Sequence, residues 1–239
     1  MNNHIYQTNY GPLIVLETMG HKARGRFVET NYERTFWLKD LKTGRVRDLY
    51  YRSVLDVGYL GEGPYSHLLT HKVYHDWYDM FRRCYDLEFK AKNKTYKECY
   101  VDDSFHCLQD FGLWYDKQRA PDDWCVDKDL LVRNNKVYGA ETCCRLPVEL
   151  NTCINRQTSK RTEICIGVYD INGNIYSRFN VLGLSKAFGY RCDESISNAF
   201  HYYKKHKEAY IKKLAKHYKS ELKKRVYDAL MTYEVRQDD

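Results

Sequence analysis

The stretch Trp124–Arg156, WCVDKDLLVRNNKVYGAETCCRLPVELNTCINR, decides the fold predicted for this chain. It begins with an apolar strand that ends in the cluster Asp127–Asp129, and Asn134–Asn135 then suits a tight turn. A second strand is predicted over Lys136–Tyr138, and a polar helix start follows it. The order strand, hairpin, helix therefore defines the centre of the chain.

Two amphipathic helices are predicted ahead of this stretch. Aromatic residues recur every three or four positions over Lys72–Asp86, and Ser104–Gln118 shows the same spacing. Such a stripe is core packing in most proteins, so we expect the two helices to pack on each other. The basic segment Lys90–Lys97 between them suits an exposed loop.

Several short motifs around these elements occur together in one known family. The matching residues are Trp77, Met80, Arg83, Cys84 and Tyr85, then Thr95, Tyr96, Lys97, Cys99 and Val101, then Gln109 to Tyr115, and last VDKD, NKVYxxETCC and xxELN within Trp124–Arg156. As a set covering roughly a third of the chain, they resemble the HNH (His-Me finger) nucleases of phages, including homing-endonuclease-like proteins. The resemblance implies a ββα-metal unit.

In such a unit, the acidic residue that ends the first strand and an Asn in the helix hold one divalent cation. The resemblance gives these roles to Asp127 and Asn151, whose oxygen atoms suit Mg²⁺ or Mn²⁺. Where the family has His as general base, this chain has Lys128, and a lysine beside a cation and a phosphate is normally protonated. The predicted catalytic residues are Asp127, Lys128 and Asn151, with Lys128 either replacing the base or holding the phosphate.

The pattern changes to strands after Ile164. IGVYD and IYSRFNV flank the turn Asn172–Gly173, a third strand is expected near Ser185–Tyr190, and a helix with a break near His206 is expected from Asp193 to Tyr233. Three strands and one helix resemble the AP2-like DNA-binding module often attached to phage HNH proteins. In that module the sheet lies in the major groove.

Basic and polar residues supply the predicted contacts with double-stranded DNA. Between His201 and Arg225 the chain has ten Lys or Arg and two acids, Glu208 and Glu221. These cations either form a solvated helix face or contact phosphates. Alternation along the strands also exposes Tyr169, Tyr176, Arg178 and Asn180, or their neighbours if the strand register is shifted by one residue. The residues predicted to bind DNA are Arg145, Arg156, Lys160, Arg161, Tyr169, Tyr176, Arg178, Asn180, Lys186, Lys204, Lys205, Lys212 and Lys216.

An apolar face runs along the same C-terminal helix, opposite the lysines. Its members recur every three or four residues and are Ile211, Leu214, Ala215, Tyr218, Leu222, Val226 and Leu230. This face either packs back on the core or pairs with a second copy in a homodimer.

The N-terminal part is predicted to form a small antiparallel sheet or barrel. Its β-rich runs are Leu13–Glu17, Arg26–Thr30, Thr35–Lys39 and Val46–Tyr50. The glycine-rich segment Val57–Pro64 that follows is interpreted as a linker.

Composition sets the outer limits. The start MNNHIYQTNYG lacks the features of a signal peptide and the chain has no run of about 18 apolar residues, so we expect a soluble protein of the cytoplasm, that of the host if a phage encodes it, without a membrane partner. The net charge of +7 permits an anionic partner. Nine irregularly spaced cysteines indicate free thiols, or a structural Zn²⁺ at Cys84, Cys99, Cys143 and Cys144.

The predicted fold class is α+β, with a small β domain over 1–63, an HNH-like ββα-metal domain with helices over 64–160, and over 161–239 an AP2-like three-stranded sheet with a long basic helix. The predicted function is that of a phage-type HNH endonuclease, which cleaves or nicks DNA with one metal ion. Two alternatives stay open at this point. One is a non-cleaving DNA-binding or regulatory protein on the same scaffold, and the other is a protein that binds an acidic protein partner, such as a host enzyme.

Overall fold

The computed structural model describes residues 4–155, 163–180, 187–192 and 195–237. It is a mixed α and β structure, as the sequence predicts. Contacts divide the chain into two compact units: unit 1 comprises Met1–Tyr115 with Lys136–Ala140, and unit 2 comprises Asp116–Asn135 with Glu141–Asp239. The three-part division predicted from the sequence stays a prediction.

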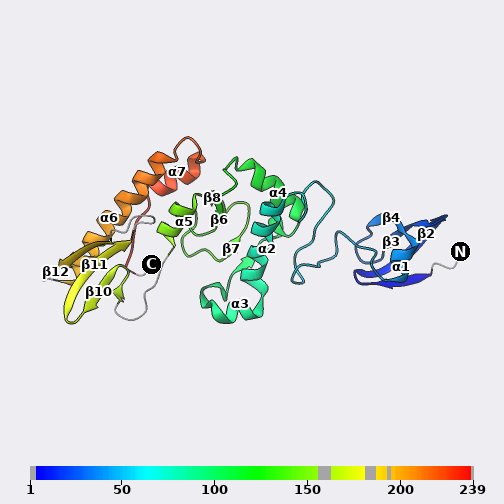
Figure 1. Ribbon diagram of the computed structural model, residues 1–239, viewed down its shortest axis with the longest axis horizontal. Coiled ribbons are helices and arrows are strands. Elements are labelled where there is room, and N and C mark those ends of the chain that lie inside the picture. The colour runs from blue at the N-terminus through cyan, green and yellow to red at the C-terminus, as the bar shows by residue number, and fades with distance from the viewer. Residues whose placement is uncertain (1–3, 156–162, 181–186, 193–194, 238–239) are drawn as a thin grey trace. The chain divides into compact units, whose positions relative to one another are not determined.

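Four antiparallel strands form the N-terminal sheet of unit 1 (Figure 1). They are β1 (Ile5–Thr8), β2 (Gly11–Met19), β3 (Lys22–Phe27) and β4 (Glu33–Trp37), in that order across the sheet. In β3, KARGRF, buried and exposed residues alternate strictly, because one face of the strand covers the core. That core consists of Leu13, Ala23, Phe27, Phe36, Leu41 and Val46. The predicted small antiparallel sheet is confirmed.

The strand predicted over Val46–Tyr50 is wrong, and a short helix, α1 (Leu38–Lys42), follows β4 instead. Asp48 explains the difference. One of its carboxylate oxygens accepts from the backbone N–H of Tyr50 at 2.8 Å and the other accepts from the Thr30 hydroxyl at 2.6 Å. An aspartate that bonds the backbone two residues on favours a turn over a strand.

Two helices form the core of the rest of unit 1, as predicted. They are α2 (His71–Tyr85) and α4 (Leu108–Lys117), with the short helix α3 (Leu87–Lys92) and the 3₁₀ turns Lys94–Tyr96 and Asp103–Phe105 between them. Trp77 on α2 is fully buried, and its indole N–H donates to the carbonyl of Phe105 at 2.7 Å. Because α3 and the first of these 3₁₀ turns overlap Lys90–Lys97, the exposed loop predicted there is partly helical.

The glycine-rich segment Val57–Pro64 is a packed part of unit 1, so its interpretation as a linker is wrong. Gln109 on α4 anchors it: Nε2 donates to the carbonyls of Leu60 at 2.9 Å and Tyr65 at 3.0 Å, and the Tyr65 N–H donates to Oε1 at 3.0 Å. A Cβ built on Gly63 would stand 2.2 Å from that same Oε1 atom. Glycine serves here for close backbone approach rather than for flexibility.

The strand pairing of the Trp124–Arg156 stretch differs from the predicted hairpin. Strand β6 (Cys125–Asp127) pairs antiparallel with β8 (Cys144–Leu146), and helix α5 (Val148–Ile154) follows β8 in unit 2. The strand β7 (Val137–Tyr138) pairs instead, in parallel, with β5 (Tyr100–Val101) of unit 1. A strand-strand-helix order is thus present, but β8 is its second strand and the predicted Asn134–Asn135 hairpin is wrong.

The C-terminal sheet has four strands where three were predicted. They are β9 (Glu163–Cys165), β10 (Val168–Ile171), β11 (Asn174–Asn180) and β12 (Ala187–Cys192), in the order β12-β11-β10-β9. The predicted turn at Asn172–Gly173 is confirmed, with positive φ at both residues. Helix α6 (Ile196–His217) lies along β10, β11 and β12 (Figure 1).

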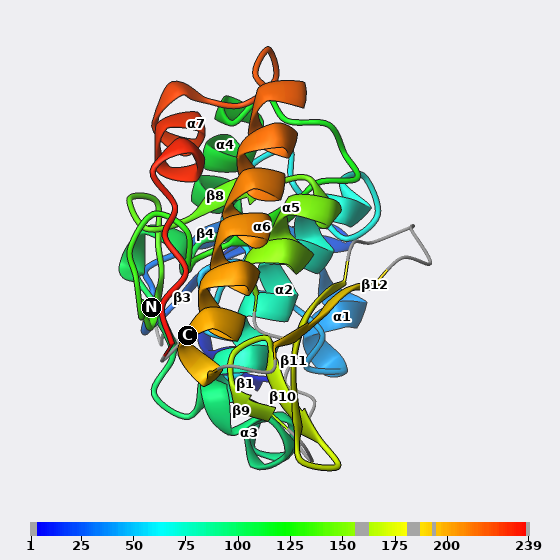
Figure 2. The ribbon, with the colours of Figure 1, turned by 90° about the vertical axis from the view of Figure 1, so that its left-hand side faces the viewer.

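Helix α6 is continuous through His206, so the break predicted there is wrong. The chain turns over 218–223 and continues as α7 (Lys224–Met231), which lies beside α6 (Figure 2). Ser195 caps α6, its hydroxyl accepting from the Asn198 N–H at 3.1 Å, whereas the predicted cap Asp193 lies outside the described residues.

The predicted apolar face of these helices packs on the core of unit 2. Ile211, Leu214, Ala215, Leu222, Val226 and Leu230 join Trp124, Cys144, Leu146, Leu150, Cys153 and Ile154 in one buried cluster. Tyr218 packs against its margin. The face on which the predicted homodimer rested is therefore covered by the unit itself. Among the helices that the structure describes, none has both the length and the apolar composition needed to cross a bilayer.

Candidate functional site

Asp127 ends β6, as the sequence predicts, and its carboxylate is turned inward. The residue is 4% exposed, and its Oδ2 atom accepts from the backbone N–H groups of Asp129 at 2.9 Å and Leu130 at 2.8 Å. Burial raises the pKa of Asp127 to about 6, because a charged carboxylate is poorly solvated there. One carboxylate oxygen thus holds the start of the following loop.

Lys128, the residue at the position of the general base, is also buried, at 7% exposure. Its ammonium donates to the carbonyl of Asn135 at 2.9 Å and pairs with the Asp129 carboxylate. The Asn135 side-chain amide donates back to the Lys128 carbonyl at 2.7 Å. These bonds close the loop between the two residues, and an ammonium that donates in this way has no lone pair with which to accept a proton.

Asn151 lies on α5, the helix that follows β8. Its side-chain oxygen accepts from the amide of Asn155 at 2.9 Å. The strand-strand-helix order therefore brings Asp127 and Asn151 into one small substructure of unit 2. A Mg²⁺ or Mn²⁺ ion at the predicted site would take one oxygen ligand from each of these side chains. In the structure Asp127 Oδ2 and Asn151 Oδ1 accept hydrogen bonds from within the protein and Lys128 is held in its loop, so each of the three predicted residues has a local structural partner.

Other predicted site residues have structural partners. Arg145 on β8 is 4% exposed and donates to the carbonyls of Ala120 at 3.0 Å, Pro121 at 2.6 Å and Trp124 at 3.3 Å. It braces the segment that leads into β6, so its predicted role as a DNA contact is corrected. His106, which lies outside the β6–β8–α5 substructure, is held by the Val101 carbonyl at 3.0 Å.

The C-terminal sheet places its predicted contact residues on one face. Tyr169 of β10 is the cross-strand partner of Tyr176 of β11, and Arg178 follows two positions along β11. The neighbouring pair, Val168 and Ser177, is fully buried on the opposite face. Val168 belongs to the cluster in which Phe200 and Tyr203 of α6 pack, so the tyrosine face is turned away from the helix. Of the residues that the alternation was predicted to expose, Arg178 is exposed and Tyr169 and Tyr176 are half-buried.

Some predicted DNA contacts cannot be placed on this face. Arg156, Lys160, Arg161 and Lys186 lie outside the described residues, and only the backbone of Asn180, at the end of β11, is described.

The lysines of α6 differ in their surroundings, and Lys213 is exposed to one side of the three that share a stripe. Lys205 and Lys216 are exposed and Lys212 is half-buried, and their spacing of seven and four residues puts all three on one stripe of the helix. Lys204 is held by the Val235 carbonyl at 2.8 Å and by Glu208 at 2.8 Å. Lys207 is 3% exposed and belongs to the interior.

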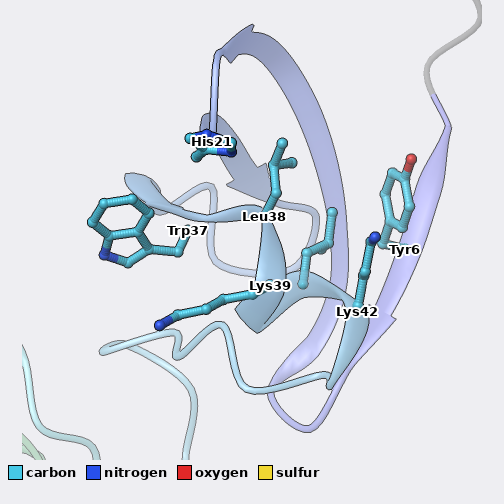
Figure 3. Close-up of a pocket in the computed structure, with 7 residues that line it drawn as sticks. Tyr6, His21, Trp37, Leu38, Lys39 and Lys42 are labelled. Atoms are coloured by element: carbon cyan, nitrogen blue, oxygen red, sulfur yellow. The ribbon is translucent and has the colours of Figure 1, made fainter.

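Two features of unit 1 were missed by the sequence reasoning. One is a pocket of about 630 Å³ beside α1, lined by Tyr6, His21, Trp37, Leu38, Lys39, Leu41 and Lys42 (Figure 3). Trp37 is 48% exposed there, with the ammonium groups of Lys22 and Lys39 at 4.7 Å and 5.8 Å from its ring centre. No sequence pattern indicated this pocket, because most of its lining residues come from the two edge strands, β1 and β4, and from α1, which are separated in the sequence.

The other feature is a histidine cluster. Among the residues that the structure describes, one group of three or more His, Cys, Asp or Glu side chains has ligand atoms within 4.8 Å of one another, and it consists of His67, His71 and His75. Their regular spacing of four residues was visible in the sequence. None of the four cysteines proposed for Zn²⁺ belongs to it, and the eight cysteines whose side chains the structure describes are thiols that form no disulfide.

Comparison with known proteins adds no relative, since no protein-family model, curated protein sequence or solved structure matches the chain.

Proposed function

We propose that this chain is a double-stranded DNA-binding protein that contacts DNA through its C-terminal sheet. The observation that carries the proposal is the placement of Tyr169, Tyr176 and Arg178 on the sheet face turned away from α6. A two-stranded ribbon fits the major groove, where an arginine can bond guanine and phosphate oxygens. The AP2-like resemblance of this region supports the same geometry.

The exposed stripe of α6 supplies the second part of the proposal. Lys205, Lys212 and Lys216 lie together on that stripe and have phosphates as natural partners. This stripe lies on the side of α6 opposite Phe200 and Tyr203, which pack toward the sheet, so the lysines face away from the sheet. The sheet positions the protein on one stretch of duplex, while the lysines contact phosphates of a separate stretch and add affinity that does not depend on sequence.

Binding without cleavage is the form of this function that the geometry favours. A hydrolytic site needs a base beside the attacking water, and the side chain at that position, Lys128, is held by Asn135 and Asp129.

An HNH-type nuclease is the second candidate, and one observation favours it. Asp127 is a buried carboxylate at the end of a strand with a raised pKa, and groups perturbed in this way concentrate at functional sites. In this candidate, Asp127 and Asn151 hold Mg²⁺ or Mn²⁺.

The test of DNA binding is fluorescence anisotropy with a labelled duplex at several salt concentrations. We expect Arg178→Ala to weaken binding by about 5- to 150-fold, because an arginine contact contributes about 1–3 kcal/mol. The matched control is Arg24→Ala on the N-terminal sheet, an arginine that is also exposed and that we expect to leave the affinity unchanged. Equal losses in the two variants, or no binding by the wild type, would refute the proposal.

Cleavage separates the two candidates. Supercoiled plasmid and phage DNA are incubated with the protein and Mg²⁺ or Mn²⁺, beside Asp127→Asn, which keeps an oxygen acceptor for the loop N–H groups. Intact DNA at protein concentrations that saturate binding supports the non-cleaving form. Nicking by the wild type that is lost in the variant establishes the nuclease instead.

A further inference from the structure

The histidine cluster of unit 1 contains none of the residues that we assign to DNA contact. His71 and His75 occupy successive turns on one face of α2, with ring centres 4.3 Å apart. His67 approaches from the segment that precedes the helix, with its ring centre 5.4 Å from that of His71 and 6.4 Å from that of His75. Three imidazoles thus converge from one helix face and one turn.

The turn that carries His67 is fixed by its own hydrogen bonds. The Ser66 N–H donates to the Thr70 hydroxyl at 2.9 Å, and that hydroxyl donates to the Ser66 carbonyl at 3.0 Å. The Leu69 N–H donates to the Ser66 hydroxyl at 3.2 Å. The His67 ring also packs edge-on against Tyr74, with ring centres 5.1 Å apart. The backbone of the third histidine is therefore held before any ligand arrives.

The distances suit a transition metal. Two nitrogens bound to one tetrahedral Zn²⁺, each at about 2.0–2.1 Å, lie about 3.4 Å apart. The candidate ligand atoms are all within 4.8 Å of one another, so small rotations of exposed side chains bring them into range. Imidazole nitrogen suits Zn²⁺, Co²⁺, Ni²⁺ and Cu²⁺, whereas Mg²⁺ prefers oxygen.

We propose that His67, His71 and His75 form a binding site for a divalent transition metal of the Zn²⁺ type, with water in the fourth position. All three side chains are exposed, so the ion and its water are accessible from solvent. His67 also lines a pocket of about 530 Å³ together with Arg47, Glu62 and Tyr74. An open fourth position of this kind lets another ligand replace the water.

The experiment uses the full-length protein without an affinity tag, stripped of metal by a chelator. Isothermal titration with Zn²⁺ is expected to give one site per chain with a dissociation constant in the micromolar range or tighter. The double variant His71→Ala/His75→Ala is expected to lose at least 100-fold in affinity. The control is His201→Ala/His217→Ala, which removes two exposed histidines of α6 and is expected to bind as the wild type does.

Two further measurements keep the outcome clear. His67→Ala lies outside the helix, and it is expected to weaken Zn²⁺ binding without changing the circular dichroism spectrum. Co²⁺ bound by imidazole gives visible d–d absorption without the near-ultraviolet band of a thiolate, which separates this site from the cysteines. The proposal is overturned if the double variant binds Zn²⁺ like the wild type, or if bound Co²⁺ shows thiolate absorption that both variants retain.

Discussion

Lys207 of α6 is a charged residue whose side chain is buried in unit 2. In the sequence, Lys207 is one of ten cations in a basic segment. In the structure it is buried, with its ammonium 5.5 Å from the ring centre of Tyr203 and its helix packed on the core. Burial lowers the pKa of Lys207 to about 8, because the charged form loses its hydration.

The lowered pKa makes Lys207 a source of instability at neutral pH. Below about pH 8 the lysine is charged in both the folded and the unfolded state, so folding bears the full cost of burying the charge. Between about pH 8 and the ordinary value of 10.5 the folded form releases its proton first, and stability rises with pH. A pKa shift from 10.5 to about 8 corresponds to about 3 kcal/mol in the free energy of unfolding.

We therefore expect Lys207→Met to stabilise the protein by about 1–3 kcal/mol at pH 7, since methionine fills similar space without a charge. The gain should shrink as the pH rises from 8 toward 10. Urea denaturation at pH 7 and pH 9.5 measures both effects. The control Lys205→Met removes an exposed lysine two residues away and should change neither value. A destabilised Lys207→Met protein at pH 7 would contradict the argument.

Among the helices and strands, those whose formation depends on residues close together in the sequence were predicted correctly. Helix α2 follows from the spacing of its aromatic residues, and the β10–β11 hairpin follows from Asn172–Gly173, because both depend on residues close in sequence. The alternation of side chains along a strand also places Tyr169 and Tyr176 on one face, because it has a period of two residues. For the same reason, the contact face of the candidate DNA site was predictable.

Pairing between distant segments was not predictable in the same way. Strand β8, Cys144–Leu146, is buried at every position, so it has no alternation to mark it as a strand. The sequence therefore assigned β6 a partner in the nearer strand β7. The bonds that hold Lys128 to Asn135 could not be foreseen either, because they depend on how the loop closes.

The glycine-rich segment gives a prediction about an element. Gln109→Leu removes the amide that bonds Leu60 and Tyr65, and it leaves their buried backbone groups without these bonds. We expect a loss of about 2–4 kcal/mol in the free energy of unfolding, measured by urea denaturation. Gln7→Leu, on the exposed side of β1, is the control and should stay within about 0.5 kcal/mol. Equal stability of the two variants would mean that the segment is the loose linker that its composition suggests.

At the scale of the whole molecule, charge is distributed less simply than the net value of +7 indicates. Of the ten cations between His201 and Arg225, Lys207 is buried, Lys204 pairs with Glu208, and Lys224 pairs with Asp228. Arg225 donates to the Cys143 carbonyl and pairs with Glu141. The stripe of Lys205, Lys212 and Lys216 carries charge that acts on a distant polyanion by its electrostatic field. The attraction for DNA is therefore set by the charges exposed on the surface, and not by the net charge of the chain.

The salt dependence of DNA binding tests this distribution. Each lysine that neutralises a phosphate contributes about 0.9 to the slope of log affinity against log salt concentration. The triple variant Lys205→Gln/Lys212→Gln/Lys216→Gln should therefore lower the slope by about 2–3, with a loss of affinity that is greatest at low salt. The control Lys39→Gln/Lys42→Gln/Lys90→Gln removes the same charge from unit 1 and should leave the slope almost unchanged. If both triple variants lower the slope equally, the attraction comes from net charge alone. If neither does, the lysines of α6 are only a solvated face, and DNA contact rests on the sheet.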